Sequence, residues 1–462
     1  MIIFPLIFLC SFIIAIREII KGNIQGFLLF VIFGLSMYTT AMSVAFMIGF
    51  KDIIPAFQFF KELLILSVLT INLFTLRKRP RFHIVDYLIF AFFLYTLTYA
   101  LLPIGEQNFF DRLIAFKSTS FFVMVYFAGR FFDPTKIYIN KYFNYILLLT
   151  IAAGAVICLE VAFNQHLQTV TGYADYSYYF FNFEPSGNYG LTWTFESEGG
   201  FKRFASFFAN PLENAAAQLI ALATIAALYT RDDNKFKPDL TGLLALGASF
   251  ICIVFAISRA PLASYFLVVY IYALLTKKKY ITHTIHLAFL TVALYFIWVI
   301  SNFEDKTSGI TEVVINTLNF SNPSSVGHVV EWVDGITSMI TSPFGLGLGT
   351  SGRVGGSLGE TTGGENQFII IGVQAGILAL LCYLAIYISF IRTGIHWLPK
   401  LRGRERKVCM MVLLIKVAIF IPLLTSEVES SSYISYMNWF FSGLLISIIM
   451  QYKKGQEVFY AS

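Results

Sequence analysis

Long apolar windows, separated by short polar or charged segments, recur along this chain and limit what it can fold into. A helix of about 20 apolar residues crosses the hydrocarbon core of a bilayer, and its backbone must satisfy its own hydrogen bonds there. Thirteen windows can be marked, at residues 1–16, 27–48, 60–76, 84–102, 113–130, 143–163, 211–229, 240–256, 260–275, 282–300, 367–391, 409–424 and 435–450. The pattern predicts an all-α polytopic membrane protein in which residues 1–462 form a single transmembrane domain.

The first window has no basic residue before it and no small-residue cleavage site after it, so we expect a retained helix and not a signal peptide. It is the weakest window, and the predicted count is therefore about 12 or 13 helices. Hydrophobic residues make up 57% of the chain and charged residues 13%, whereas soluble domains carry about 25% charged residues. This composition excludes a soluble enzyme, a disordered chain and a nucleic-acid-binding domain, so no nucleic-acid partner is expected.

Basic residues collect in every second loop. These loops contain 23 of the 33 Lys and Arg residues but only 8 of the 27 Asp and Glu residues. Their basic residues are Arg17, Lys21, Arg77–Arg81, Arg130, Lys136, Lys141, Arg231, Lys235, Lys237, Lys277–Lys279, Arg392–Lys407, Lys453 and Lys454. Because loops rich in Lys and Arg stay in the cytoplasm, the C-terminus is predicted inside and, with thirteen spans, the N-terminus outside. Two long loops, 164–210 and 301–366, then face outward.

Every predicted cytoplasmic connection is short, which leaves no room there for a nucleotide-binding domain. No Walker or GxGxxG loop occurs, and the five cysteines lie in or beside the apolar windows, so no disulfide framework is predicted. The six histidines are scattered, no outward DxD pair is present, and no metal site or cofactor is predicted. If the protein is an enzyme, its chemistry faces outward and its donor is already in the membrane.

The first outward loop, 164–210, is aromatic, with acidic residues between its rings. Tyr176 and Tyr179 are candidates for stacking on sugar faces, although an interfacial aromatic belt or simple loop packing explains such rings equally well. The second outward loop, 301–366, divides into a helix-capable part near 326–340 and a glycine-rich part. Nine glycines occur in residues 345–364, which predicts either backbone N–H groups that cradle an anion or an unstructured lid.

Basic residues on the outward side are few, which makes Lys202, Arg203, Arg259 and Arg353 informative. An arginine at membrane depth costs about 2.5–3.5 kcal/mol on insertion scales and persists when it has an anionic partner. Phosphate is such a partner, because a guanidinium group binds it bidentately. Snorkelling, or an ion pair with an acid such as Glu213, is the structural alternative. Lys416, within the twelfth window, must face the interior, where a structural pair and a substrate contact are both open.

Four outward segments carry recognisable motifs. The first is RFASFFANPLENA from Arg203, which includes Asn210 before a proline, and the second is Ser258–Arg259 in ISRAPLASY. The third is HVVEWVDGITSMITSPFGLGLG, with His328 and Trp332, and the fourth is Glu365–Asn366 in ENQFIIIG. In order, spacing and outward placement they resemble the bacterial O-antigen polymerase and O-antigen ligase superfamily over about residues 203–390.

The chain departs from that family's pattern at specific positions. Ser206 stands where glycine is usual, and His328 stands where the family usually has an arginine four residues before the tryptophan. Arg353 is a candidate for the missing positive charge. Glu365 stands where ligases have a catalytic histidine, whereas polymerases vary more at this position. The resemblance therefore favours a polymerase over a ligase.

The resemblance implies a GT-C-like glycosyltransferase in the bacterial cytoplasmic (inner) membrane, with its active site on the periplasmic side. Donor and acceptor would both be oligosaccharides linked to undecaprenyl diphosphate, and the expected reaction is inverting and metal-independent. Arg203 and Arg259 would stabilise the leaving diphosphate and Glu365 would act as the base. The other expected substrate-binding residues are Lys202, Asn210, Ser258, His328, Trp332, Arg353, Asn366, Tyr176 and Tyr179.

Two alternatives remain open at this stage. One is an O-antigen ligase that transfers finished glycan from undecaprenyl diphosphate to lipid A–core. The other is a transporter, a lipid-linked oligosaccharide flippase, which should show internal repeats and short loops on both sides. No repeat is visible and loop 301–366 is long, so the enzyme is favoured. Besides membrane lipid, a chain-length regulator protein is a candidate partner that the sequence does not decide.

Overall fold

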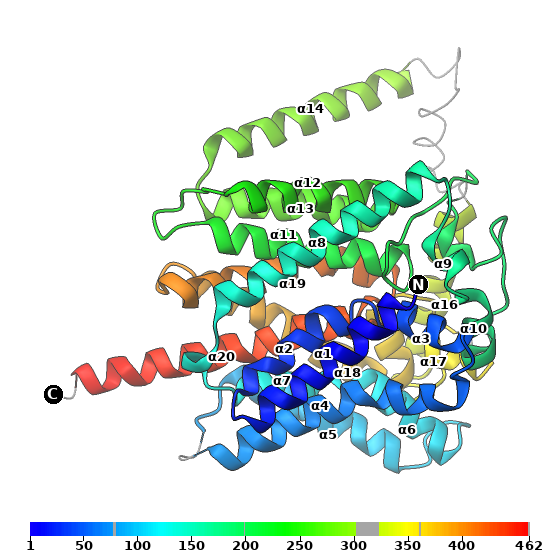
Figure 1. Cartoon of the computed structure of the whole chain (residues 1–462), viewed down its shortest axis with the longest axis horizontal. Helices are drawn as coiled ribbons and strands as arrows, with labels where there is room; N and C mark the ends of the chain where they lie inside the picture. Colours follow the sequence, from blue (N-terminus) through cyan, green and yellow to red (C-terminus); the bar gives the residue numbers. More distant parts are fainter. Residues whose placement is uncertain (77–79, 198, 302–322, 360–361, 461–462) are drawn as a thin grey trace.

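The computed structural model describes residues 1–76, 80–197, 199–301, 323–359 and 362–460. Helices dominate these residues, and the only strand-like pairs among them are isolated bridges such as Ser186–Leu191. The long helices lie roughly along a common direction and form one bundle (Figure 1). The prediction of an all-α polytopic membrane protein is therefore confirmed at the level of architecture.

The helices follow the apolar windows closely. Their bounds are α1 Ile3–Ile20, α2 Phe27–Leu29, α3 Tyr38–Met47, α4 Ile54–Thr75, α5 Ile84–Leu101, α6 Phe109–Ser120, α7 Phe122–Arg130, α8 Ile139–Ala162, α9 Leu167–Val170, α10 Tyr173–Phe181, α11 Pro211–Tyr229, α12 Leu240–Phe255, α13 Arg259–Leu275, α14 Lys279–Ser301, α16 Pro323–Thr341, α17 Gly352–Ser357, α18 Gln367–Trp397, α19 Gly403–Thr425 and α20 Ser432–Tyr460.

Among the described residues, eight helices are long and apolar enough to cross a membrane, or nine if the bent pair 24–34 and 38–47 is one span. Helices α12 and α13 are apolar but shorter, with 16 and 17 residues. The window at 113–130 forms two helices, α6 and α7, that meet at Phe121. The thirteen windows thus all contain helix, while the count of 12 or 13 complete spans stays a prediction.

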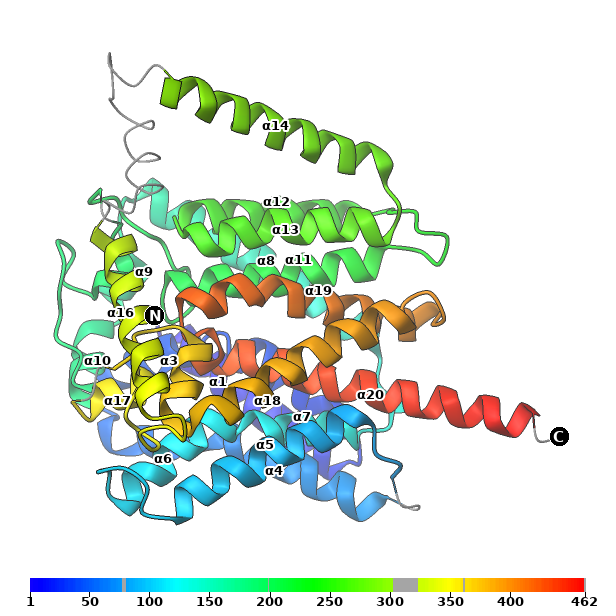
Figure 2. The same ribbon diagram turned by 180° about the vertical axis from the view of Figure 1, so that it is seen from behind.

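The two sets of loops gather at opposite ends of the bundle. Helices α9, α10, α16 and α17 lie at the end that also holds the N-terminus, and we call this the loop-rich end (Figure 1). The basic loops 230–239, 276–278 and 398–402 lie at the other end with the C-terminus (Figure 2). The charge asymmetry of the sequence is therefore an asymmetry in space, as a fixed membrane orientation requires.

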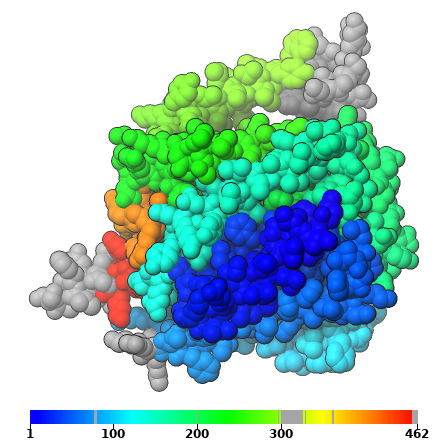
Figure 3. Space-filling view, in the orientation of Figure 1, coloured from blue at the N-terminus to red at the C-terminus, as the bar shows by residue number. Residues whose placement is uncertain are grey.

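The centre of the bundle is built from α11, α19 and α20, whose apolar windows are the most buried of the candidate spans. Helix α20 packs along α7, and α11 packs against α19 and α13. Many of the inward residues of α11 are alanines, and small side chains let helices approach closely within a bilayer. Helix α14 lies at the edge next to α13 and forms a separate ridge in the space-filling view (Figure 3).

Helix α18 is interrupted at Gly376, where φ is 82° and ψ is 174°. The break frees two carbonyl groups, which accept hydrogen bonds from a distant segment: Leu346 N–H donates to Val373 O at 2.7 Å and Gly347 N–H to Gln374 O at 3.0 Å. A Cβ atom on Gly376 would lie only 2.5 Å from the carbonyl oxygen of Pro343. The Pro-x-Gly-x-Gly motif at 343–347 therefore packs into the break in α18.

This packing corrects the expectation of a lid or an anion cradle for the first part of the glycine-rich run. The amide groups of Leu346, Gly347 and Gly349 donate within the protein, the last of them to the side-chain oxygen of Gln374 at 3.1 Å. A backbone donor that is already paired is not free to bind an anion. Further along the run, residues 352–357 form the short helix α17.

Candidate active site at the loop-rich end

Residues 203–210 form a buried platform before α11. Ser206 has a positive φ of 54°, its N–H donates to the Glu160 carboxylate at 2.8 Å, and its carbonyl accepts from the Gln168 amide at 2.7 Å. A positive φ costs an L-residue energy but suits glycine. This backbone conformation gives a physical reason for the glycine that the resembling family usually has here.

The platform places Arg203 against the turn between α12 and α13. Its Nε donates to the carbonyl oxygen of Ala256 at 2.9 Å, and the neighbouring Phe204 N–H donates to Phe255 O at 3.0 Å. The same turn leads into Ser258 and Arg259, which begin α13. Two motifs that are distant in sequence are thus joined by backbone hydrogen bonds, and their two arginines lie at the same end of the bundle.

The charge of Arg203 interacts with both other predicted catalytic residues. Burial lowers the pKa of Arg203 to about 10, the negative charge of Glu365 opposes this shift, and the positive charge of Arg259 adds to it. With a pKa of about 10, Arg203 remains protonated at neutral pH. Arg203, Arg259 and Glu365 come from three separate segments and lie within electrostatic range, with Arg259 and Glu365 exposed. We call them the Arg–Arg–Glu site.

The position of Glu365 is fixed by the residues that follow it. The Asn366 side-chain oxygen accepts from Phe368 N–H at 3.0 Å and Ile369 N–H at 3.2 Å, which caps the N-terminus of α18. Helix α16 covers this helix start at Gly335, where a Cβ atom would lie 2.2 Å from the Ile369 side chain. Asn366 therefore orients the chain at Glu365 through a helix cap.

Other predicted substrate-binding residues also have structural partners. The Asn210 side-chain oxygen accepts from Glu213 N–H at 2.9 Å and caps α11. The Lys202 ammonium donates to the carbonyl oxygen of Asn164 and lies 5.0 Å from the Tyr189 ring. Ser258 is buried at the start of α13. These residues hold the platform and its neighbours together around the Arg–Arg–Glu site.

In the aromatic loop 164–210, the structure corrects the prediction that Tyr176 stacks on a sugar. Tyr176 is only 1% exposed, its hydroxyl accepts from the Gln58 amide at 3.2 Å, and its ring packs on Phe180 and Phe181. A ring this buried cannot stack on a sugar, so its aromatic signal reflects packing of α10 against α3. Tyr179 is 59% exposed and stays a candidate for sugar contact.

The motif on α16 is only partly described. Trp332 is half-buried and packs beside Met339, Ile369 and Val373, so it helps to hold α16 on α18. Its indole N–H has no hydrogen-bond partner among the described residues. The side chain of His328 lies outside the described part of the chain, and its predicted contact with substrate stays a prediction.

Arg353, the candidate for the missing charge, lies on α17 next to the half-buried carboxylate of Glu427. Its backbone N–H donates to the Glu427 carboxylate at 2.8 Å, and its guanidinium lies 5.2 Å and 5.5 Å from the rings of Phe181 and Phe183. Burial raises the pKa of Glu427, while the hydrogen bond and charge of Arg353 oppose the rise and Glu365 adds to it. Glu427 therefore connects Arg353 electrostatically to the Arg–Arg–Glu site.

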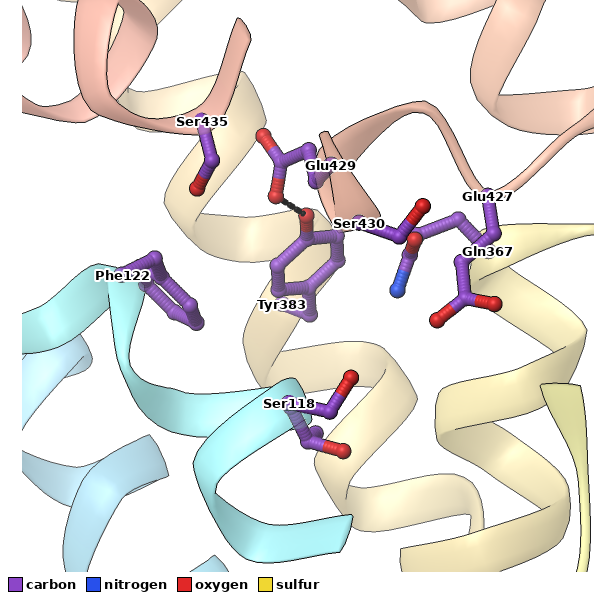
Figure 4. Close-up of a pocket in the computed structure, with 9 residues that line it drawn as sticks. Ser118, Phe122, Gln367, Tyr383, Glu427, Glu429, Ser430 and Ser435 are labelled. Atoms are coloured by element: carbon purple, nitrogen blue, oxygen red, sulfur yellow. Dashed lines mark hydrogen bonds between the residues drawn. The ribbon is translucent and has the colours of Figure 1, made fainter. Parts of the chain in front are cut away.

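Sequence reasoning missed the short loop 426–431 that carries Glu427. Together with neighbouring helices, this loop lines a small polar pocket with a volume of about 10 Å³, which is room for about one water molecule (Figure 4). Its lining residues are Ser118, Thr119, Phe122, Gln367, Tyr383, Glu427, Glu429, Ser430 and Ser435. The signal in the sequence was Glu-Val-Glu-Ser, two carboxylates in a short outward loop between two apolar windows.

The pocket contains both satisfied and unsatisfied polar groups. Glu429 accepts from the hydroxyls of Tyr383 at 2.5 Å and Tyr387 at 2.7 Å, and from the Asn438 amide at 2.7 Å. By contrast, the side-chain oxygen of Gln367 is buried without a hydrogen-bond partner in the described structure. Because buried polar atoms are normally paired, Gln367 has room for a donor from water or from a ligand hydroxyl.

Lys416 faces the interior, as its place in an apolar window requires. It is fully buried, and its ammonium lies 3.6 Å from the Trp439 ring centre and 4.6 Å from that of Tyr387. Cation–π contacts of this kind stabilise a desolvated ammonium group. The described contacts of Lys416 are thus structural and lie within the bundle.

Searches of protein-family models and of curated proteins found no match to this chain. The site contains the half-buried Arg203, the exposed Arg259 and the exposed carboxylate of Glu365. A polar pocket lies at the same end of the helix bundle. This arrangement suits an anionic, membrane-borne substrate with a hydroxyl group to be deprotonated.

Proposed function

We propose that this chain is a polysaccharide polymerase of the inner membrane. It would join undecaprenyl-diphosphate-linked repeat units of an O-antigen or exopolysaccharide at the periplasmic face. The observation that carries the proposal is the convergence of Arg203, Arg259 and Glu365, which come from three segments and interact at one end of the bundle. The same three residues stand at the motif positions that resemble this superfamily.

In the proposed reaction, the diphosphate leaves without needing a proton. As the bond between the sugar C1 and the phosphate oxygen breaks, its electron pair goes to the diphosphate, whose growing charge needs cations. Arg203 and Arg259 supply two guanidinium groups for this purpose. By analogy with lost oxyanion donors, removing either should slow the reaction by about 10²–10³-fold.

The acceptor must lose a proton as its oxygen bonds to C1. Glu365 is exposed beside the two arginines and takes that proton in the proposed step, so the step balances without a metal. A single displacement inverts the anomeric centre. Comparison of the anomer in the donor linkage with that in the product tests this point, and retention of the donor anomer would contradict it.

The experiment that tests the function is complementation of a deletion strain, with the glycan ladder separated on a gel. The wild-type gene should restore the ladder, whereas Glu365→Gln and Arg203→Ala should not, although both proteins insert at normal levels. Glu184→Gln is the matched control, because Glu184 is an exposed carboxylate in loop 164–210 and should leave the ladder intact. A full ladder with Glu365→Gln would overturn the base assignment.

The deletion strain itself separates the candidate functions. Single repeat units on the acceptor would support a polymerase. Full-length glycan stranded on undecaprenyl diphosphate, with a bare acceptor, would instead indicate a ligase. Repeat units that never reach the outer face would indicate a flippase.

A further inference from the structure

A second group of cations lies at the loop-rich end, on helices that do not carry Arg203 or Arg259. Lys117 on α6 and Lys61 on α4 both face the Glu62 carboxylate, with N–O distances of 2.6 Å and 3.9 Å. Glu62 is buried, and its second oxygen has no hydrogen-bond partner in the described residues. Two ammonium groups therefore share one carboxylate, which leaves an excess of positive charge.

Arg353 belongs to the same group. Its charge acts on Lys61 and on Tyr38, whose ring lies 4.1 Å from the Lys61 ammonium. Helix α17, which carries Arg353, packs against α6, which carries Lys117. Among the described residues, no carboxylate lies within ion-pair distance of the Arg353 guanidinium, which rests on aromatic rings instead. We call Lys61, Lys117 and Arg353 the second cation group.

The second cation group runs from the surface into the bundle. The Lys117 side chain is 57% exposed and that of Lys61 is 16% exposed, so a ligand can reach Lys117 first. A charged side chain within a membrane-spanning helix is costly unless it is paired, and Lys61 lies within the apolar helix α4. Lys61, Lys117 and Arg353 carry three positive charges against the one negative charge of Glu62, so an anion with two charges would balance the group.

The lining of the polar pocket includes residues next in sequence to both groups of charges. Its lining includes Ser118 and Thr119, which directly follow Lys117, and Gln367, which is two residues after Glu365; Figure 4 shows Ser118 and Gln367. Hydroxyl, amide and carboxylate groups are the partners that sugar hydroxyls bind, and the Gln367 side-chain oxygen is unpaired. Glu427 interacts electrostatically with both Arg353 and Glu365, which links the two groups of charges.

We propose that Lys61, Lys117 and Arg353 form a second diphosphate-binding site, which holds the lipid-linked glycan that acts as acceptor. Arg203 and Arg259 hold the donor diphosphate, and the acceptor sugar extends past the polar pocket to Glu365. This inference rests on the proposed function, because a polymerase binds two lipid-linked glycans at once. It assigns the two substrates to two separate sets of cations.

The test is a count of bound lipid on the full-length protein by native mass spectrometry, with undecaprenyl diphosphate as the probe. Wild type should bind two molecules. Lys117→Gln should weaken one of the two binding events by about tenfold or more, as expected for a lost charge-assisted hydrogen bond, and Lys117→Arg should retain both. Lys61→Gln with Lys117→Gln should bind one molecule, and Arg203→Ala should also bind one.

The same titration includes a control variant and distinguishes the competing outcomes. Lys51→Gln should bind two molecules, because Lys51 is an exposed lysine near the start of α4 but outside the group. Because Lys117 is largely exposed, its substitution should not prevent folding. If wild type binds a single molecule that Arg203→Ala removes, the second site is wrong while the proposed donor site stands.

Two further results would change the assignment. If Arg203→Ala binds as many molecules as wild type, Arg203 does not bind the donor diphosphate. The proposed function is then wrong at its donor site, independently of the result for the second cation group. If phosphatidylglycerol displaces the molecule that depends on Lys117 as effectively as unlabelled undecaprenyl diphosphate does, the group binds phospholipid headgroups in general. That outcome would overturn its assignment to the acceptor.

Discussion

At the scale of single residues, several side chains expected to touch substrate also hold the backbone that surrounds the site. Asn210 and Asn366 cap α11 and α18, and Lys202 binds a carbonyl oxygen. A motif shows which residue types are present, but it does not show which of their atoms the backbone already occupies. Arg203 serves both purposes, because its Nε is anchored on Ala256 while its charge interacts with Arg259 and Glu365.

His166, in the first outward loop, predicts a pH dependence of stability. Its ring packs among Tyr189, Phe195 and Phe204, and neither ring nitrogen has a hydrogen-bond partner in the described residues. Burial, with the charge of Lys202 adding to it, lowers the pKa of His166 to about 4, against about 6.5 for a free imidazole. Between these values the unfolded chain binds more protons than the folded protein.

We therefore expect stability to be highest above about pH 6.5 and to fall as the pH drops towards 4. His166→Phe keeps a ring in the aromatic cluster but cannot be protonated, so it should lose less stability over that interval. The measurement is the thermal unfolding midpoint of both purified proteins in detergent at pH 7.5 and pH 5. Equal losses in the two proteins would contradict this role for His166.

At the scale of elements, the break in α18 anchors the segment that follows α16, the helix that covers the helix start beside the candidate base. The segment 343–349 fills the break, α16 covers the first turn of the helix, and Asn366 caps it beside Glu365. A break of this kind is sustained by contacts on both sides, because the freed carbonyl groups must be satisfied within a membrane. The conformation of one glycine thus affects the placement of a residue proposed to act in catalysis.

Gly376→Ala should therefore disturb both stability and activity. The backbone at Gly376 is one that residues other than glycine rarely adopt, which costs about 1–3 kcal/mol, and the new Cβ atom would collide with the Pro343 carbonyl. We expect a clearly lower unfolding midpoint and a weakened glycan ladder. Gly247→Ala in α12 is the control, because no atom lies within 4 Å of its Cβ position, and alanine favours a helix. If both variants behave alike, the break is not required.

The sequence predicted the positions of the helices well but not their interruptions. Each apolar window contains helix, yet the 66° bend between residues 24–34 and 38–47, the division of α6 from α7, and the break at Gly376 were not foreseen. Hydropathy stays high through such interruptions, so the pattern that identifies a span does not reveal them. The partners that stabilise the break in α18 come from a loop outside the helix.

At the scale of the whole molecule, the sequence indicated which motifs should meet, and the fold brings three of them together at one end. It did not indicate loop 426–431, because the importance of Glu427 depends on Arg353 and on the pocket, which come from elsewhere in the chain. It also did not indicate that Lys61 and Lys117 share Glu62. Sites built from several helices depend on packing, which a linear pattern of charge does not encode.

The orientation of the molecule gives the last prediction, since every functional proposal requires the loop-rich end to face outward. Glu184→Cys and Lys235→Cys each add one exposed thiol, at opposite ends of the bundle. Because basic loops stay in the cytoplasm, a membrane-impermeant maleimide should label Glu184→Cys in intact spheroplasts and Lys235→Cys only after lysis. Wild type controls for the native cysteines on the helices. The reverse pattern would place the Arg–Arg–Glu site on the cytoplasmic side of the membrane. Lipid-linked glycans that have already crossed to the outer face could not reach it there.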